Sequence, residues 1–489
     1  NMKLKVSIGL IVLLFSTLAF AGNKKEIPIT TDSKAAMTLY IAGQAAADVG
    51  NGTEANRLFR AATEADPSFA RAWLQVGNNA FSGGEFNAAM TKAESLAKNA
   101  SKGEALLINI NLRFMDNNFV KQVELAEELV AVYPDSPRAW LTLSNVQAGL
   151  NRFEDSRKSA KKAIDLNSGF TPAYLAMGNS LVFNDPKDFT KAEHYFKKAI
   201  ALQPGEDNHY WGLGDVYRAS GKLQEAADFY RLSTLLDANN GTAFVKLGHV
   251  NSFLGNYDDA RENYERGIDA AQPEGAPFLA NYKHFTWVHA NNPKAGVEGL
   301  KKLYEGIEAT DLPTRQKTGA MIFTLTNAAM ICMDKDMHDE ADELLEMRGK
   351  LLRADAEAVG TPEFSRIQEA NIVFFKGRAA ASRGDLRTAQ KMAKENKKLV
   401  QDEENPRKME PYHQLMGLIY LEQHKPGKAV AEFRKADLTN IYVKYHLAVA
   451  LEDSGDHDEA EALFKEVADW NFNSVGYALV RKAAIDHSS

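Results

Sequence analysis

Cysteine is almost absent from this 489-residue chain. The one cysteine, Cys332, cannot form a disulfide within the chain, which excludes a small fold held together by disulfides. Its neighbours Met330, Ile331 and Met333 are apolar, and no cationic residue stands beside it to stabilise a thiolate. We therefore expect a buried structural residue and not a nucleophile.

Proline and glycine are not enriched, and neither acidic nor basic residues are in large excess. The chain has 15 prolines and 33 glycines, and 45% of its residues are hydrophobic, which is too ordered a composition for a low-complexity or disordered protein. Its 58 basic and 65 acidic residues give a net charge of -7, and no basic block is long enough to follow a phosphate backbone. A folded protein that does not bind nucleic acid is expected.

Long hydrophobic runs are limited to one, from Val6 to Phe20. Lys3 and Lys5 precede it, and small residues suited to signal peptidase follow at positions 19–21. The run is shorter than the roughly 20 residues of a spanning helix, so a secretory signal is favoured over an uncleaved anchor or a buried helix. We expect a signal peptide at residues 1–21, cleavage before Gly22, no membrane span afterwards, and a periplasmic or secreted protein.

Sequence motifs of catalysis are missing. The chain contains no Gly-x-x-x-x-Gly-Lys, no His-Glu-x-x-His and no Gly-x-Ser-x-Gly stretch. The densest group of potential metal ligands, Asp334 to Glu340, falls where a turn between two helices is expected, and acidic residues at a helix start are favoured by the helix dipole alone. We expect no enzymatic activity, no cofactor and no metal.

What the chain does have is self-similarity at an interval of 34 residues. The pattern is clearest in two consecutive stretches, which carry Tyr210, Gly214, Tyr217, Gly221, Ala226 and Tyr230, and then Gly248, Gly255, Tyr257, Ala260 and Tyr264. Glycines such as Gly214 suit the crossing point of two helices, because a larger side chain would hold the backbones apart. A second set suits left-handed turns between helices, namely Gly84, Gly221, Gly255, Gly384 and Gly455.

These offsets resemble the tetratricopeptide repeat. The resemblance implies an all-α solenoid, a right-handed superhelix of about twelve helix hairpins with a C-terminal capping helix. The expected organisation is an extension at residues 22–35, seven repeat units at 36–274, a degenerate helical linker region at 275–321, further units at 322–474, and the capping helix and tail at 475–489. Stretches at 405–408, 442–446 and 471–477 also resemble exported repeat proteins of Gram-negative bacteria whose role is unassigned.

The resemblance further implies a concave groove lined by the first helix of each unit. Applying the family's groove positions gives a row of amides and aromatics, comprising Gln44, Asn78, Phe81, Asn111, Phe114, Asn145, Asn179, Phe183, Asp215, Arg218 and His249. Amides can pair with the N–H and C=O of any peptide backbone, which suits an extended peptide ligand. We expect a non-enzymatic protein-interaction scaffold that binds a partner's extended segment there. The alternative is a structural subunit of a cell-envelope assembly that uses its convex or edge surface.

Overall fold

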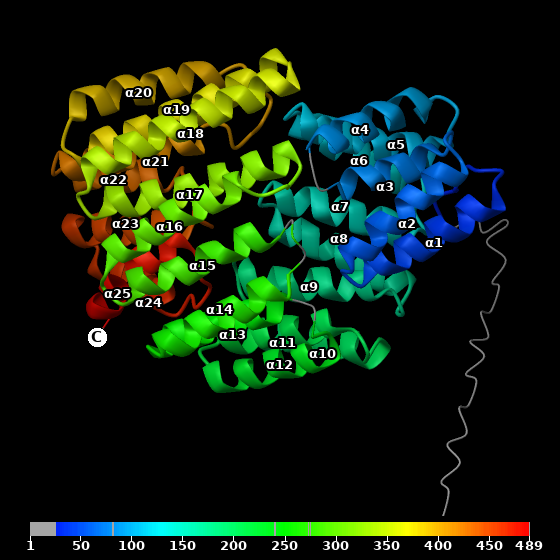
Figure 1. Ribbon diagram of the computed structural model, residues 1–489, viewed down its shortest axis with the longest axis horizontal. Helices are drawn as coiled ribbons and strands as arrows, with labels where there is room; N and C mark the ends of the chain where they lie inside the picture. Colours follow the sequence, from blue (N-terminus) through cyan, green and yellow to red (C-terminus); the bar gives the residue numbers. More distant parts are fainter. Residues whose placement is uncertain (1–25, 81–82, 239–240, 272, 274, 489) are drawn as a thin grey trace, which may run out of the picture.

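The computed structural model describes residues 26–80, 83–238, 241–271, 273 and 275–488, and this part of the chain forms 25 α-helices and no strand. The expected signal peptide and its cleavage site lie outside the described residues, as does Phe81. Consecutive helices pack in antiparallel pairs from α1·α2 to α23·α24, and α25 follows (Figure 1). The fold is an all-α solenoid.

The first seven hairpins have nearly uniform helices. Their bounds are α1 Lys34–Asp48, α2 Gly52–Ala65, α3 Ala70–Asn78, α4 Gly83–Ala97, α5 Lys102–Met115, α6 Phe119–Val132, α7 Pro137–Gly149, α8 Phe153–Leu166, α9 Thr171–Phe183, α10 Phe189–Leu202, α11 Asp207–Ala219, α12 Leu223–Leu236, α13 Gly241–Leu254 and α14 Tyr257–Asp269.

The later hairpins are less regular. Their bounds are α15 Ala276–His289, α16 Pro293–Glu308, α17 Thr314–Asp334, α18 His338–Val359, α19 Pro362–Ser382, α20 Leu386–Val400, α21 Glu410–Glu422, α22 Pro426–Phe433, α23 Ile441–Ser454, α24 His457–Ala468 and α25 Val475–His487. The segment 275–321, expected to be a degenerate linker, holds the helix pair α15·α16 and the start of α17. With 21, 22 and 21 residues, α17, α18 and α19 are longer than the helices of the first seven hairpins.

Glycine at the helix crossing allows the two helices of a hairpin to approach closely. A Cβ added at Gly214 would lie 2.5 Å from the Tyr230 ring, and one at Gly248 would lie 2.6 Å from the Tyr264 ring. Both tyrosines are fully buried. In both hairpins an aromatic ring of the second helix therefore packs directly on the backbone of the first helix at the glycine.

Left-handed residues make the turns inside the hairpins. Gly221, Gly255, Gly384 and Gly455 all have positive φ, as the sequence predicts. The prediction for Gly84 is wrong, because this residue lies inside α4, which begins at Gly83.

Neighbouring hairpins are joined by a repeated hydrogen bond. The Trp73 indole donates to the Pro67 carbonyl at 3.0 Å, the Trp140 indole to Pro134 at 2.8 Å, and the Tyr210 hydroxyl to Pro204 at 2.9 Å. Each bond spans six residues, from the proline that ends one unit to the aromatic residue in the first helix of the next. The bond ties the end of one unit to the first helix of the next.

The solenoid closes on itself. In Figure 1 the helices α1–α8 lie on one side, α9–α14 below, and the later helices on the other side. The loop after α20 reaches the turn between α5 and α6, where Asn117 donates to the Glu403 carboxylate at 2.7 Å. On the other edge, Lys187 of the turn before α10 forms an ion pair with Glu466 of α24 at 2.9 Å. The C-terminal hairpins are thus held against both the early and the middle ones.

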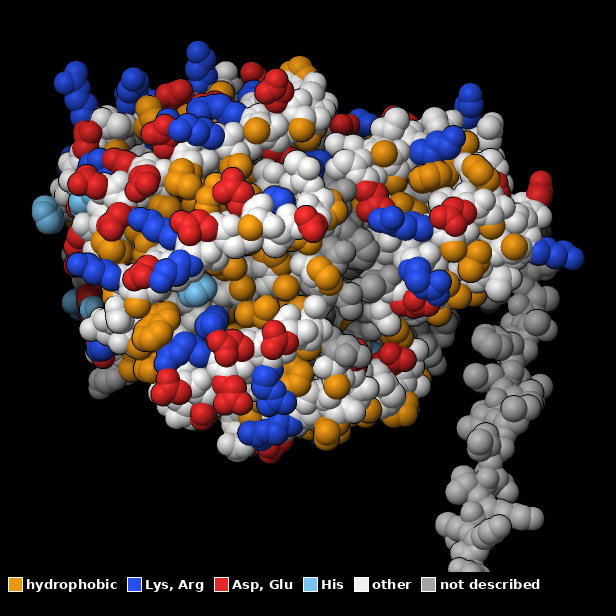
Figure 2. All heavy atoms as spheres, in the orientation of Figure 1, with side chains coloured by type: hydrophobic (Ala, Val, Ile, Leu, Met, Phe, Trp, Pro, Cys, Tyr) orange, Lys and Arg blue, Asp and Glu red, His pale blue; other side chains and the backbone are white. Residues whose placement is uncertain are grey.

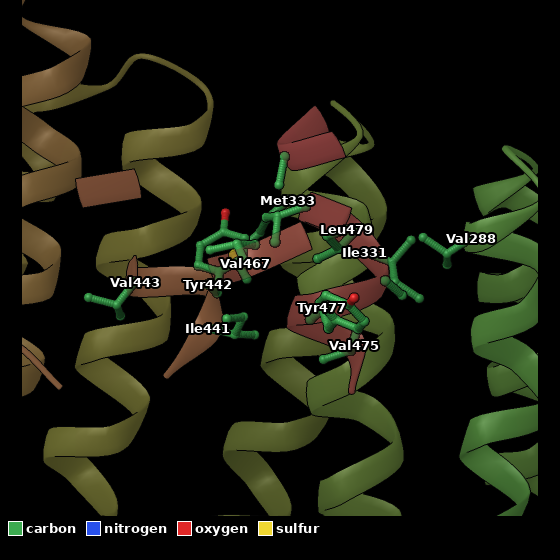
Figure 3. Close-up of a cluster of buried hydrophobic side chains, with 14 of the residues drawn as sticks. Val288, Ile331, Met333, Ile441, Tyr442, Val443, Val467, Val475, Tyr477 and Leu479 are labelled. Carbon is green, nitrogen blue, oxygen red and sulfur yellow. The ribbon is translucent and has the colours of Figure 1, made fainter. Parts of the chain in front are cut away.

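The last helix does more than cover the end of the array. Besides α23 and α24, α25 packs against α15 and α17. Figure 3 shows Tyr477 and Leu479 of α25 among apolar side chains that include Val288 of α15 and Ile331 of α17. This cluster joins helices nearly two hundred residues apart. It also contains Cys332, whose thiol pKa burial raises to about 12.

An extended segment, residues 26–31, crosses the starts of three first helices, and we call it the N-terminal strap. The Glu26 carboxylate accepts from Ser136 at 2.8 Å, the Thr30 N–H donates to Glu104 at 2.8 Å, and Thr31 donates to Asp66 at 2.5 Å. Ser136, Glu104 and Asp66 lie at or beside the N-terminal ends of α7, α5 and α3. The strap therefore ties the second, third and fourth units together along one edge.

Candidate peptide-binding cavity

The first helices of units one to four line an open cavity of about 430 Å³. Its walls come from α1, α3, α5 and α7, with Phe119 and Gln122 added from α6. The lining includes the sequence-predicted residues Gln44, Asn78, Asn111, Phe114 and Asn145. The volume lies within the range typical of ligand sites.

The lining side chains form layers across the helices, because residues three and four apart share one helix face. One layer holds Asn78, Asn111 and Asn145, the next along the helices holds Leu74, Leu107 and Leu141, and the third, toward the helix N-termini, holds Arg71 and Arg138. Figure 2 shows that basic and acidic side chains are intermixed over the outer face that it presents. The cavity differs from that surface in its ordered amide, apolar and cationic layers.

Two asparagines of the amide layer have free hydrogen-bonding groups. Asn78 and Asn145 are exposed and have no hydrogen-bond partner in the described part of the chain, whereas Asn111 donates to the Leu107 carbonyl at 2.9 Å. Phe114 stands beside them with 59% of its surface exposed. Free amides beside an exposed aromatic ring are suited to hold a peptide backbone and one apolar side chain.

The two arginines of the third layer have different partners. Arg138 forms a two-point ion pair with Asp48, with N–O distances of 3.0 and 2.7 Å, which bridges α7 to the end of α1. Arg71 is 4% exposed, and its Nη1 donates to the Ile27 and Pro28 carbonyls of the N-terminal strap, each at 3.2 Å. Both arginines escaped the sequence prediction, although the repeated stretch Arg-Ala-Trp-Leu at 71–74 and 138–141 was a signal for them.

The predicted groove residues of later units lie elsewhere. Asn179 is exposed on α9 but does not line the cavity. Asp215, Arg218 and His249 are 1%, 2% and 6% exposed, so the expectation that they face an open groove is corrected. Arg218 is covered by the chain's own residues 470–474, between α24 and α25, through Phe472, and we call this segment the C-terminal plug. Asp215 is engaged by Tyr230 and Lys246, and His249 packs against Tyr264 and Tyr282.

The C-terminal plug makes both aromatic and polar contacts with these helices. The Phe472 ring lies 4.6 Å from the Phe183 ring and 4.3 Å from the Arg218 guanidinium. Asn473 donates to the Tyr264 hydroxyl at 3.0 Å and interacts with His289 Nε2 at 3.1 Å. The middle of the groove is therefore filled from within the chain.

Beneath the plug lies a buried charge network. Asp215 accepts from the Tyr230 hydroxyl at 2.7 Å and forms ion pairs with Lys246 at 2.6 Å and Arg218 at 3.0 Å. Burial lowers the pKa of Lys246 to about 8 despite the opposing pull of Asp215. Asp215 is thus fully engaged by Tyr230, Lys246 and Arg218, whereas the Arg218 guanidinium, which lies against Phe472, keeps its Nε and Nη1 buried without a hydrogen-bond partner among the described residues. The network is buried within the packing of α11 to α13.

Within the described ranges, no three His, Cys, Asp or Glu side chains are grouped so as to hold a metal ion. The predicted acidic group around Asp336 forms the turn between α17 and α18, where Asp336 adopts a φ of 56°. None of the described helices combines the length and the apolarity needed to cross a bilayer.

Comparison with known families identifies the repeating unit. The tetratricopeptide repeat matches residues 40–104 and 185–240 in one form, and 137–170, 241–273 and 441–474 in another. The chain is a tetratricopeptide-repeat solenoid. Tetratricopeptide repeats mediate interactions between proteins and are generally non-enzymatic.

Similar proteins share only parts of their length with this solenoid. The anaphase-promoting complex subunit 3 of Schizosaccharomyces pombe is 27% identical over 159 residues, 32% of this chain and 23% of that protein. The peroxisomal targeting signal receptor of Candida albicans is 23% identical over 277 residues, 53% of this chain and 44% of that protein. The chain thus spans less than half the length of these curated relatives.

Among solved structures, the Cut9–Hcn1 hetero-tetramer of the anaphase-promoting complex is similar with a TM-score of 0.41 and 16% identity. The similarity covers 90% of this chain and 77% of that chain.

Proposed function

We propose that this protein is a non-enzymatic scaffold that binds an extended peptide segment of a partner protein in the cavity of its first four units. One observation carries the proposal. Four successive first helices bring predicted amide residues to a single cavity, and Asn78 and Asn145 there have no partner in the described part of the chain. A peptide supplies the alternating donors and acceptors that such amides can pair with.

Selection from a displayed library of random nonapeptides provides the test. An enriched peptide is synthesised, and its Kd is measured by fluorescence polarisation. Each amide hydrogen bond contributes about 0.5–1.5 kcal/mol, so Asn78→Ala with Asn145→Ala should weaken binding about ten- to a hundredfold. The thermal midpoint should hardly move, because both side chains are exposed.

The matched control is Asn179→Ala, an exposed asparagine on α9 outside the cavity, which should leave the Kd unchanged. If no peptide is enriched, or if the double variant binds as tightly as the unchanged protein, the cavity is not the binding site. The alternative of a structural subunit in a cell-envelope assembly, contacting partners by its convex or edge surface, would then take its place.

We also propose that the protein is exported. Lys3 and Lys5 before the single long apolar run, and the small residues at 19–21, support this. N-terminal sequencing of the protein recovered from the cell envelope or the medium should begin at or near Gly22. Recovery from the cytoplasm with Met2 retained would contradict export.

A further inference from the structure

The peptide-binding cavity carries one positive charge that the chain does not neutralise. Arg71 and Arg138 are its charged lining residues, and no aspartate or glutamate lines it. Arg138 is neutralised by its two-point pair with Asp48. Arg71 forms no ion pair with any described carboxylate, and its Nε is buried without a hydrogen-bond partner. The end of the cavity near the N-terminus of α3 is therefore cationic.

Glu104 is the carboxylate on α5 that occupies the place corresponding to Arg71 on α3. Its oxygens are already engaged, however. They accept from the Thr30 N–H at 2.8 Å and, at the start of α5, from the Ser101 N–H at 2.9 Å and the Ser101 hydroxyl at 2.8 Å. Glu104 is 1% exposed and holds the N-terminal strap in place. It serves the fold and leaves the guanidinium of Arg71 without a charge partner.

The Arg71 guanidinium has two backbone carbonyls and the Tyr40 ring, 5.5 Å away, as partners, but no paired carboxylate. Burial of a guanidinium without a paired carboxylate costs free energy that an incoming carboxylate would recover. Arg71 and Asn78 are seven residues apart on one face of α3, about 10.5 Å along the helix at 1.5 Å per residue. A peptide backbone held at the amide layer must therefore send its carboxylate across the leucine layer. A glutamate side chain does this, with its methylene groups against Leu74 and Leu107.

We propose that the peptide bound in this cavity carries a glutamate side chain that pairs with Arg71. The inference rests on the proposed peptide binding, and it adds the chemistry by which the partner is recognised. A side chain is required rather than a terminal carboxylate, because the amide layer continues on both sides of α5 and holds the backbone away from Arg71.

The probe is the library-selected nonapeptide, synthesised with an acetylated N-terminus and an amidated C-terminus so that only side chains are charged. Selected sequences should share a glutamate, and replacing it by glutamine should weaken binding at least tenfold. Replacing it by aspartate, which is one methylene shorter, should also weaken binding. Selected peptides without an acidic residue, or equal binding of the glutamate and glutamine forms, would overturn this inference while leaving peptide binding intact. Failure to select any peptide would instead overturn the proposed function.

Variants of the protein show whether Arg71 is the partner. Arg71→Gln should reduce the ratio of glutamine-form to glutamate-form Kd to about one, whereas Arg71→Lys should retain most of it. Thr31→Ala, which removes the strap's bond to Asp66 without touching the guanidinium, should leave the ratio unchanged. A role of Arg71 in strap docking alone would weaken both peptide forms equally, and that result would overturn the proposal. If Arg71→Gln fails to fold, the ratio of glutamine-form to glutamate-form Kd is compared between the unchanged protein and Arg71→Lys. A ratio of about one in both would overturn the proposal.

Discussion

Single glycines set the spacing of the helix pairs, and Gly214 provides a test. Even the methyl group of Gly214→Ala would lie 2.5 Å from the buried Tyr230 ring. That ring cannot retreat easily, because its hydroxyl donates to Asp215 at 2.7 Å. Overpacking of this kind costs about 1–3 kcal/mol, so the urea midpoint and the thermal midpoint should both fall.

Gly319→Ala is the matched control, since Gly319 lies inside α17 and an added Cβ there meets nothing within 4 Å. It should be neutral or slightly stabilising, because alanine favours the helix over glycine. Equal midpoints for the two variants would show that Tyr230 can move and that Gly214 does not control the spacing.

At the residue scale, the role of a residue could be predicted only where the repeat pattern determines it. Gly214 and Gly248, and likewise Gly221 and Gly255, are 34 residues apart, so their roles at the helix crossing and in the turn could be predicted. The covering of Arg218 by Phe472 could not be predicted, because the two residues are more than two hundred positions apart in the sequence. A repeat pattern describes neighbours in the array and carries no information on contacts across it.

At the scale of elements, the N-terminal strap acts as a brace for the first units. Removing residues 22–31 should leave Glu104 and Arg71, which are 1% and 4% exposed, without their hydrogen bonds to the strap. Hydrogen bonds to charged groups contribute about 1.5–3 kcal/mol each, so the first units should lose several kcal/mol. Hydrogen exchange should accelerate in α3 and α5 and remain unchanged in α19 and α20. Uniform exchange rates in both regions would contradict the bracing role.

The degenerate helical region expected at 275–321 illustrates why the 34-residue frame is hard to follow there. In α15·α16 the small residue at the close contact is Gly299 on the second helix, and it faces His284 of the first helix. In the regular hairpins the glycine is on the first helix, as at Gly214. Because the two roles are exchanged, the 34-residue frame fails there although a normal helix pair forms. The longer α17 to α19 then shift the frame further.

For the whole molecule, His289 of α15 links closure of the array to pH. Burial lowers the pKa of His289 to about 4, with Asn473 opposing and Arg481 reinforcing the shift. The ring also faces Phe253 and Tyr477. Since the unfolded chain has a histidine pKa near 6.5, it binds more protons than the folded chain between about pH 6.5 and 4. The free energy of unfolding should therefore fall as the pH falls through that window.

Urea unfolding at several pH values measures this effect. His289→Gln should reduce the slope of stability against pH between about 6.5 and 4, because glutamine does not titrate. The exposed His457 on α24 provides the matched control, His457→Gln. His284, also in α15 and with its pKa lowered by burial to about 4, should account for part of the remaining slope. If His289→Gln leaves the slope of stability against pH unaltered, His289 does not link closure of the array to pH.

Closure has a consequence for how such an array can change in evolution. An open solenoid tolerates the gain or loss of a repeat, since each unit touches only its neighbours. Here Lys187 must meet Glu466, Asn117 must meet Glu403, and Phe472 must meet Phe183. One extra hairpin between these partners would rotate and displace every later unit, and all three contacts would be lost together. The number of repeats is therefore a fixed property of this fold, and homologues that keep these contacts should differ by loop insertions and not by whole units.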